Sequence, residues 1–355
     1  MRSRTVRTHV ARDEVNTAFE LGGVSVAAGS RTVVDLPVAR LYTHTDLSMP
    51  VEVINGRRAG PCLFVCAAIH GDELNGVEII RRLLRHSALK RLQGTLVAIP
   101  VVNVHGLLHR SRYLPDRRDL NRSFPGSEKG SLASRMAGLF MREIVARCTH
   151  GIDLHTGAEY RNNFPQIRAN LDDDETLELA RAFGAPVMIN ADLRDGSLRA
   201  AASRIGIPML LYEAGEALRF DEIAIRAGLR GVLNVMRALG MLPHKRSSKR
   251  IVEPVVASSS SWVRAPESGI LNTSIPLGSR VAKGAVLGTV TAPLSDLRSR
   301  VEAPFDSIVI GRTNMPLVHE GEALFHLARF KRVSHAEDQV VALQESMAPS
   351  LVVSD

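Results

Sequence analysis

Short apolar runs of strand length recur along the middle of the chain, and stretches with helical periodicity separate them. The apolar runs cover residues 63–69, 95–102, 151–155, 186–189 and 208–213. The helical stretches lie near residues 75–86, 132–147, 175–183, 197–204 and 220–239. Strands that alternate with helices in this way predict a doubly wound, largely parallel α/β sheet.

The pattern changes on either side of this region. Residues 1–50 predict an N-terminal β segment, followed by an α/β domain over 51–240 and a Pro- and Ser-rich linker over 241–261. Residues 262–330 hold an internal repeat of short strands: Ala265-Pro266 recurs as Ala303-Pro304. This all-β C-terminal domain resembles a lipoyl/biotinyl-like barrel-sandwich module. Such modules carry their group on a hairpin lysine, and residues 292–300 contain no lysine, so we expect no carrier function. Residues 331–355 predict a polar tail.

Composition and charge exclude several classes of protein. The net charge is +8, but the basic residues are scattered, and neither an aromatic-basic pattern nor a nucleic-acid motif accompanies them, so we expect no nucleic-acid partner. No run of 18 apolar residues and no secretory signal core occurs, which favours a cytoplasmic protein without a membrane partner. Three cysteines argue against a disulfide framework. The sequence neither requires nor excludes a homo-oligomer.

The most suggestive polar residues follow the first buried strand. His70-Gly-Asp-Glu73 places an imidazole and a carboxylate three residues apart, at the edge of the sheet where α/β proteins bind ligands. Both groups are ligands for a divalent metal. The same spacing recurs in His319 and Glu322, which lie inside the β repeat and are interpreted as a chance match. We also expect Gly71 to let the backbone turn tightly between the two ligands.

Two further strands end in residues of matching chemistry. Asp153-Leu-His155 ends one of them, so His155 is the candidate third ligand and Asp153 the acceptor that orients its ring. Ligands of the His/Glu/His type, with a fourth place open, are typical of catalytic zinc. Glu213 ends another strand and is the candidate general base, with Glu216 as an alternative that we expect to face solvent.

A long loop supplies groups that can bind carboxylates. It runs over residues 103–129 and contains Arg112 and the segment Asp119-Leu-Asn121-Arg122. Guanidinium forks and an amide near a metal suit a substrate with a free carboxylate. A solvated basic loop is the alternative interpretation.

These motifs, in this order, resemble the succinylglutamate desuccinylase/aspartoacylase family of the zinc carboxypeptidase-like superfamily. The resemblance covers roughly residues 50–240 by motif. It implies that His70, Glu73 and His155 hold one zinc ion and that Glu213 is the base. It further implies that Arg112 polarises the scissile carbonyl and that Asn121 and Arg122 bind the substrate's α-carboxylate. Arg199 is a loose counterpart of the arginine that binds the acyl-group carboxylate in aspartoacylase.

The resulting expectation is a zinc-dependent deacylase that hydrolyses a small N-acylated amino acid. A zinc metallocarboxypeptidase acting on peptides would use the same centre and is the first alternative. A non-catalytic protein that binds a metal or a ligand is the second. Metal content and kinetics on N-acyl amino acids against longer peptides distinguish the three.

Overall fold

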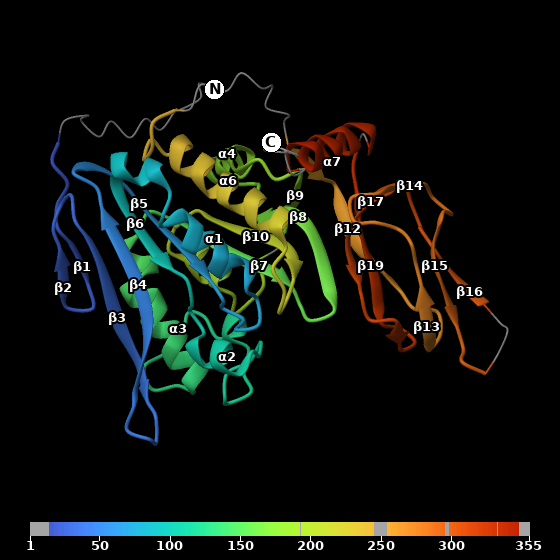
Figure 1. Ribbon diagram of the computed structural model, residues 1–355, viewed down its shortest axis with the longest axis horizontal. Helices are drawn as coiled ribbons and strands as arrows, with labels where there is room; N and C mark the ends of the chain where they lie inside the picture. The colour runs from blue at the N-terminus through green and yellow to red at the C-terminus, as the bar shows by residue number, and fades with distance from the viewer. Residues whose placement is uncertain (1–13, 192, 245–253, 295–297, 332, 348–355) are drawn as a thin grey trace, which may run out of the picture.

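A computed structural model describes residues 14–191, 193–244, 254–294, 298–331 and 333–347 (Figure 1). One sheet of thirteen strands runs through the α/β region and into the C-terminal module, and its main path is β12-β19-β17-β8-β10-β7-β5-β6-β4-β3. The strands of the α/β region are β3 (Arg31–Arg40), β4 (Asp46–Asn55), β5 (Arg58–Ala67), β6 (Gln93–Ile99), β7 (His150–Gly157), β8 (Arg161–Ala169), β9 (Val187–Asn190) and β10 (Met209–Glu216).

The sheet is mixed, so the prediction of a largely parallel sheet is correct for its central strands and for the branch in which β9 pairs with β8, but not for the whole sheet. Strands β10, β7, β5 and β6 are parallel neighbours. On one side β4 and β3 continue the sheet antiparallel, and on the other β8 pairs antiparallel with β10. Helices connect the parallel neighbours β5 and β6 through residues 75–83, and β8 and β9 through residues 174–183, as parallel pairs require. The N-terminal β3 and β4 thus extend the central sheet, while β1 (Phe19–Leu21) and β2 (Val24–Val26) form a separate hairpin.

Helices cover both faces of the central strands (Figure 1). On one face lie α1 (Asn75–Leu83), α4 (Asp174–Phe183) and α6 (Glu222–Ala238), which bury Ile79, Leu179 and Val232 in a common core. The second core contains Phe140 of α3 (Leu132–Glu143) and Leu198 of α5 (Leu198–Arg204). The short helix α2 (Val104–His109) follows β6. Burial on both faces explains why the central strands are continuous apolar runs.

The C-terminal repeat is visible in the strand order. Its first half contains β13 (Gly269–Asn272), β14 (Arg280–Val281) and β15 (Val286–Thr291), and its second half contains β17 (Ser307–Thr313), β18 (Leu317–Val318) and β19 (Ala323–Arg329). Each short strand pairs with the other half, β14 with β17 and β18 with β13. Strand β16 (Arg298–Glu302) joins β15 at the outer edge. The two halves are therefore interlocked.

Two predicted boundaries are corrected. Part of the expected linker is strand: β11 (Val255–Ala257) pairs with β9, and β12 (Ser259–Arg264) pairs with β19. Its serines alternate between exposed and half-buried positions, which a Ser-rich composition does not reveal; linker residues 245–253 lie outside the described residues. Most of the expected tail forms α7 (Val333–Met347), which buries Ala336 and Val340 in a third hydrophobic core together with Phe164 and Ile310. Within the described residues, no helix is both long and apolar enough to cross a membrane.

Candidate active site

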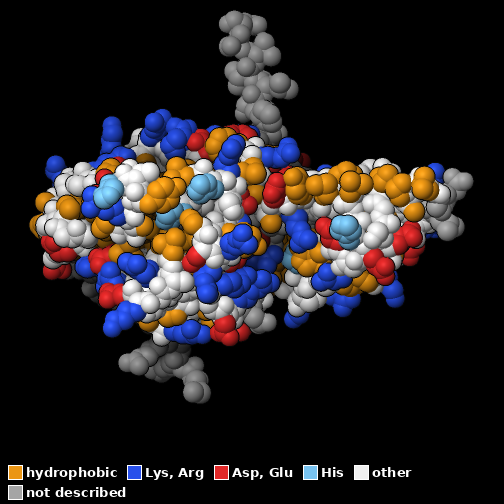
Figure 2. Space-filling model, turned by 90° about the horizontal axis from the view of Figure 1, so that it is seen from below, with side chains coloured by type: hydrophobic (Ala, Val, Ile, Leu, Met, Phe, Trp, Pro, Cys, Tyr) orange, Lys and Arg blue, Asp and Glu red, His pale blue; other side chains and the backbone are white. Residues whose placement is uncertain are grey.

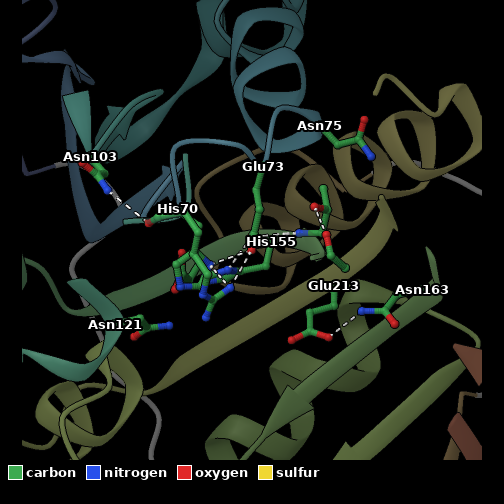
Figure 3. Close-up of polar contacts among 12 residues, drawn as sticks. His70, Glu73, Asn75, Asn103, Asn121, His155, Asn163 and Glu213 are labelled. Carbon is green, nitrogen blue, oxygen red and sulfur yellow. Dashed lines mark hydrogen bonds and ion pairs between the residues drawn. The ribbon is translucent and has the colours of Figure 1, made fainter. Parts of the chain in front are cut away.

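Three neighbouring parallel strands deliver the candidate site to one edge of the sheet. His70 and Glu73 lie in the turn between β5 and α1, and His155 lies near the end of β7, the next strand. Glu213 lies directly opposite His155 in the β10–β7 register. Because the carboxyl ends of parallel strands meet at one edge, residues more than 80 positions apart in the chain come together here (Figure 3).

Gly71 is required for a different reason from the one expected. Its backbone is not in the left-handed region, but a Cβ atom there would lie 1.9 Å from the carbonyl carbon of Gly106. The turn between the two ligands therefore packs directly on the backbone of α2. Only glycine allows this close approach.

His70, Glu73 and His155 form a compact, buried cluster. Their candidate ligand atoms all lie within 4.8 Å of one another. Nδ1 of His70 is 2.6 Å from Oε1 of Glu73, and Nδ1 of His155 is 2.7 Å from Oε2 of the same carboxylate. Each of the three residues is at most 5% exposed. The backbone N–H of Thr156 also donates to Oε2 of Glu73, at 3.0 Å.

Each imidazole is oriented by a carboxylate that contacts its Nε2 atom, the ring nitrogen away from Glu73. Nε2 of His155 lies 2.7 Å from Oδ2 of Asp153, as predicted, and Nε2 of His70 lies 3.2 Å from Oδ1 of Asp119. A hydrogen bond at Nε2 leaves Nδ1 as the nitrogen that faces the centre of the cluster. This is the arrangement that fixes the tautomer of metal-binding histidines.

The electrostatics of the cluster suit a cation. Burial alone would lower the pKa of His155, but Asp153 and Glu73 raise it well above its usual value. Burial alone would raise the pKa of Glu73, but the two imidazoles that face it lower that pKa strongly. Two nitrogens and one carboxylate, converging from rigid elements with their outer atoms hydrogen-bonded, match the donor set of a catalytic zinc site. The residues present therefore fit a divalent metal.

Arg112 lies beside the cluster, and Asp119 holds it there. Nη2 of Arg112 donates to Oδ2 of Asp119 at 2.8 Å, and Nη1 lies 3.2 Å from Nδ1 of His70. Asp119 thus contacts both the candidate ligand and the candidate carbonyl-polarising group. Burial would raise the pKa of Asp119, but His70 and Arg112 lower it well below its ordinary range. Asp119 belongs to the motif Asp119-Leu-Asn121-Arg122, but the sequence pattern gave it no role of its own.

The predicted carboxylate-binding residues all line the same cavity. They differ in exposure and in the hydrogen bonds that they already make within the protein. Oδ1 of Asn121 accepts from the backbone N–H of Leu198 at 2.9 Å, which leaves its Nδ2 as the donor available to a ligand. Arg122 is exposed and donates through Nη1 to the carbonyl oxygen of Asn121. Arg199 is buried, and its Nη1 donates to the carbonyl of Ala191 at 2.8 Å.

Glu213 is half-buried, and two side chains of β8 contact its carboxylate. Nδ2 of Asn163 donates to Oε2 of Glu213 at 2.9 Å, and Nε of Arg168 lies 3.3 Å from the same oxygen (Figure 3). Both contacts use Oε2. Glu216, in contrast, is buried rather than solvent-facing, and its Oε2 accepts from Asn314 at 2.7 Å. The β-bulge after Glu213 accounts for this, because it changes which side chains point inward.

These groups line one cavity of about 300 Å³. Its lining also contains residues that no sequence motif had indicated. Among the residues that the structure describes, six arginines line the cavity against two carboxylates, those of Glu73 and Glu213. The arginines are Arg112, Arg122, Arg161, Arg168, Arg194 and Arg199. Figure 2 shows basic side chains gathered in the middle of one face of the molecule. Trp262 of the C-terminal module also lines the cavity, and no sequence motif had singled it out.

The second His-x-x-Glu match lies away from this site. His319 is exposed and Glu322 is half-buried in the turn between β18 and β19. There, Oε2 of Glu322 accepts from the backbone N–H of His319 at 3.1 Å. The carboxylate thus closes a local turn, and neither residue belongs to the His70–Glu73–His155 cluster.

Comparisons with known proteins show the family of this chain. Residues 59–239 match the model of the succinylglutamate desuccinylase/aspartoacylase catalytic domain. The chain is 28% identical over 254 residues to the N-alpha-acetyl-L-2,4-diaminobutyric acid deacetylase of Halomonas elongata, covering 68% of this chain and 73% of the relative.

Solved structures share the fold over most of the chain. A succinylglutamate desuccinylase/aspartoacylase from Rhodobacter sphaeroides is 24% identical, with a TM-score of 0.75 over 84% of this chain and 96% of its own. The product-bound ectoine utilization protein EutE (DoeB) of Ruegeria pomeroyi has the same identity and TM-score, over 84% of this chain and 95% of its own. At this identity these structures support the fold alone. The family match spans more than half of the sequence, and the chain therefore belongs to the succinylglutamate desuccinylase/aspartoacylase family.

Proposed function

We propose that this protein is a zinc-dependent deacylase that hydrolyses the amide bond of a small N-acylated amino acid. The observation that carries the proposal is the buried His70–Glu73–His155 cluster, which opens into an arginine-lined cavity with Glu213 beside it. Family membership supports hydrolysis of an acyl–nitrogen bond. The Halomonas relative, by its name, deacetylates an N-acetylated amino acid of this kind.

Each residue has a distinct task in this reaction. Zinc held by His70, Glu73 and His155 would supply a Lewis acid and lower the pKa of a water molecule to about 7. Glu213 takes a proton from the attacking water as its oxygen bonds to the amide carbon. Arg112 donates to the amide oxygen as negative charge develops there. Glu213 then passes the proton to the departing nitrogen, so that a carboxylate and a free amine result.

The carboxylate of the amino acid is assigned to Asn121 and Arg122. Nδ2 of Asn121 and the exposed guanidinium of Arg122 lie on the same cavity as the metal-binding cluster. A charged fork and an amide can bind one carboxylate through several hydrogen bonds at once. The assignment explains why the substrate should be an acylated amino acid and not a simple amide. Arg199 remains a candidate for a further carboxylate, although its Nη1 is occupied by Ala191.

The size of the cavity favours small substrates over peptides. At about 300 Å³ it lies at the lower end of the range for small-molecule sites, and Trp262 of the C-terminal module borders it. An extended peptide would need a longer cleft. We therefore place the metallocarboxypeptidase second, and the non-catalytic binding protein third, because the candidate ligands, base and carboxylate-binding residues occur together.

A substrate panel tests the proposal. Purified zinc-loaded protein is assayed for amine release from N-acetyl, N-formyl and N-succinyl amino acids and from tripeptides blocked at the amino end. We expect turnover of at least one N-acyl amino acid with kcat/KM well above that of any peptide. Preference for the peptides would establish the carboxypeptidase alternative instead.

A further inference from the structure

Two of the three cysteines lie side by side, although 86 positions separate them in the sequence. Sγ of Cys62, on β5, is 3.4 Å from Sγ of Cys148, which lies just before β7. Both residues are free thiols. A disulfide bond holds its two sulfurs about 2.05 Å apart, so the pair needs to approach by only about 1.4 Å to become bonded.

Hydrogen bonds fix the backbone around the two thiols. The N–H of Thr149 donates to the carbonyl oxygen of Cys62 at 2.8 Å, and the N–H of Cys62 donates to Oγ1 of Thr149 at 3.1 Å. Leu63 and His150 then begin the parallel β5–β7 ladder. Cys148 has an extended backbone, with φ −109° and ψ 158°. As a diagonal neighbour on the adjacent strand it lies roughly 6 Å from Cys62 between Cα atoms, a separation that a disulfide spans.

The two thiols differ in their access to solvent. Cys62 is half-buried, whereas Cys148 is only 4% exposed. Burial, followed by the neighbouring thiol of Cys62, raises the pKa of Cys148 well above its usual value, so this sulfur keeps its proton. A dissolved oxidant therefore reaches Cys62 first, and Cys148 is placed to react with the oxidised sulfur afterwards.

The third cysteine provides a reference within the same molecule. Cys66 lies four residues beyond Cys62 on β5, roughly 13 Å further along the strand. Its side chain is fully buried, and its thiol contacts Oδ1 of Asp153 at 3.4 Å. Cys66 is therefore a thiol of the same strand that contacts a carboxylate where Cys62 contacts a second sulfur.

We propose that Cys62 and Cys148 form an intrachain disulfide when the protein meets a two-electron oxidant of the hydroperoxide class. The thiol of Cys62 gives up its proton, and its sulfur bonds to one peroxide oxygen as the O–O bond breaks. A sulfenic acid and one water molecule result. The sulfur of Cys148 then bonds to the sulfur of Cys62, the S–O bond breaks, and the Cys148 proton leaves with the hydroxide as a second water. In total, two thiols and hydrogen peroxide give one disulfide and two water molecules.

The bond would join β5 and β7 near their amino ends. His70 and Glu73 follow the carboxyl end of β5, and His155 lies near that of β7, so the metal-binding cluster lies at the other end of both strands. The segment between the two cysteines contains α1, β6, α2 and α3. A cross-link that closes so long a segment restricts the unfolded chain and thereby stabilises the folded one. The inference does not depend on the proposed function.

Mass spectrometry of the full-length protein tests the inference. The reduced wild type is treated with a small molar excess of hydrogen peroxide, and catalase removes the remainder. Free thiols are alkylated in denaturant, and the protein is digested without reduction. We expect one linkage, between Cys62 and Cys148, with Cys66 alkylated. Dithiothreitol should restore three free thiols, and neither Cys62→Ser nor Cys148→Ser should form a linkage.

Thermal unfolding gives a second readout. The oxidised wild type should unfold at a Tm higher than that of the reduced protein by on the order of 5 °C, and dithiothreitol should reverse the shift. Cys62→Ser is the matched control, because it retains the other two thiols and all the methionines but cannot form the bond. Peroxide should not raise its Tm.

Alkylation of both Cys62 and Cys148 after the peroxide treatment would overturn the inference. Oxidation of Cys62 to the sulfinic acid beside a free Cys148, or a linkage through Cys66, would overturn it as well. A Cys62–Cys148 linkage without any rise in Tm would contradict the stabilising effect. The wild-type mapping decides the linkage even if the serine variants fail to fold.

Discussion

Asp153→Asn tests the hydrogen bond that orients His155, one of the candidate metal ligands. Asp153 is fully buried, and its Oδ2 lies 2.7 Å from Nε2 of His155. Asparagine has the same shape, but its amide can present a donor where the carboxylate only accepts. If Nδ2 faces His155, the ring must carry its proton on Nδ1, the nitrogen that would bind the metal. Even with Oδ1 facing the ring, the negative charge that strengthens the ligand is lost.

The expected magnitude follows from the role of Asp153. Loss of such an outer hydrogen bond typically weakens metal binding about 10- to 100-fold, which corresponds to about 1.4–2.7 kcal/mol. We expect the upper part of this range because the contact is short and inaccessible to water. The thiol of Cys66, 3.4 Å from Oδ1, is the other side chain in contact and gives no compensating charge.

Zinc affinity is measured by competition against a chelator of known affinity, with the thermal midpoint of the metal-free protein as a test of folding. Glu175→Gln is the matched control, because it makes the same carboxylate-to-amide change next to another histidine. Oε1 of Glu175 lies 3.0 Å from Nε2 of His150, and the Glu175 side chain is exposed. That variant should bind zinc as the wild type does. An Asp153→Asn protein that is folded and binds zinc with wild-type affinity would refute the reasoning.

Three further predictions concern other parts of the site. Arg112→Ala should lower kcat by on the order of 10²–10³ in steady-state kinetics, the usual loss for one oxyanion donor, and a loss below threefold would remove Arg112 from that role. Gly71→Ala should lower the free energy of unfolding in urea by about 1–3 kcal/mol, because its Cβ atom meets the backbone of Gly106, and an unchanged midpoint would contradict this. Burial, with a smaller effect of Arg168, lowers the pKa of His326 to about 3, so the folded state keeps the ring neutral while the unfolded state takes up a proton below about pH 6.5. Stability should therefore fall as the pH drops from 6.5, by about 2 kcal/mol at pH 5, and His326→Gln should lack this part of the pH dependence in paired urea titrations.

The part of the site that lies on the central strands could be predicted from the sequence. His70, Asp153, His155 and Glu213 each occur at the end of an apolar run, and parallel topology brings such ends together without knowledge of the exact register. The clustering of His70 and His155 around Glu73 follows from topology. The sequence also contained the outer acceptor Asp119, but nothing local indicates that it bonds His70 from 49 residues away.

The remaining parts of the fold and of the site depend on contacts between distant segments, which local composition does not predict. Trp262 reaches the cavity only because β12, β19, β17 and β8 join in one sheet, and the Ser-rich stretch before it resembles a linker. Glu216 is buried because a bulge follows Glu213, and a bulge has no clear sequence signal. The C-terminal helix was missed for a related reason, since few of its residues with a described side chain are buried and its apolar pattern is weak.

Zinc content measured together with turnover tests the central claim most directly. Wild-type protein, Glu213→Gln and His155→Ala are purified in parallel, analysed for bound zinc, and assayed on the best N-acyl amino acid of the panel. We predict one zinc ion per chain in the wild type and in Glu213→Gln, with turnover lost only in the latter, and loss of both zinc and turnover in His155→Ala. Hydrolysis by Glu213→Gln at the wild-type rate, or full zinc retention by His155→Ala, would contradict the account.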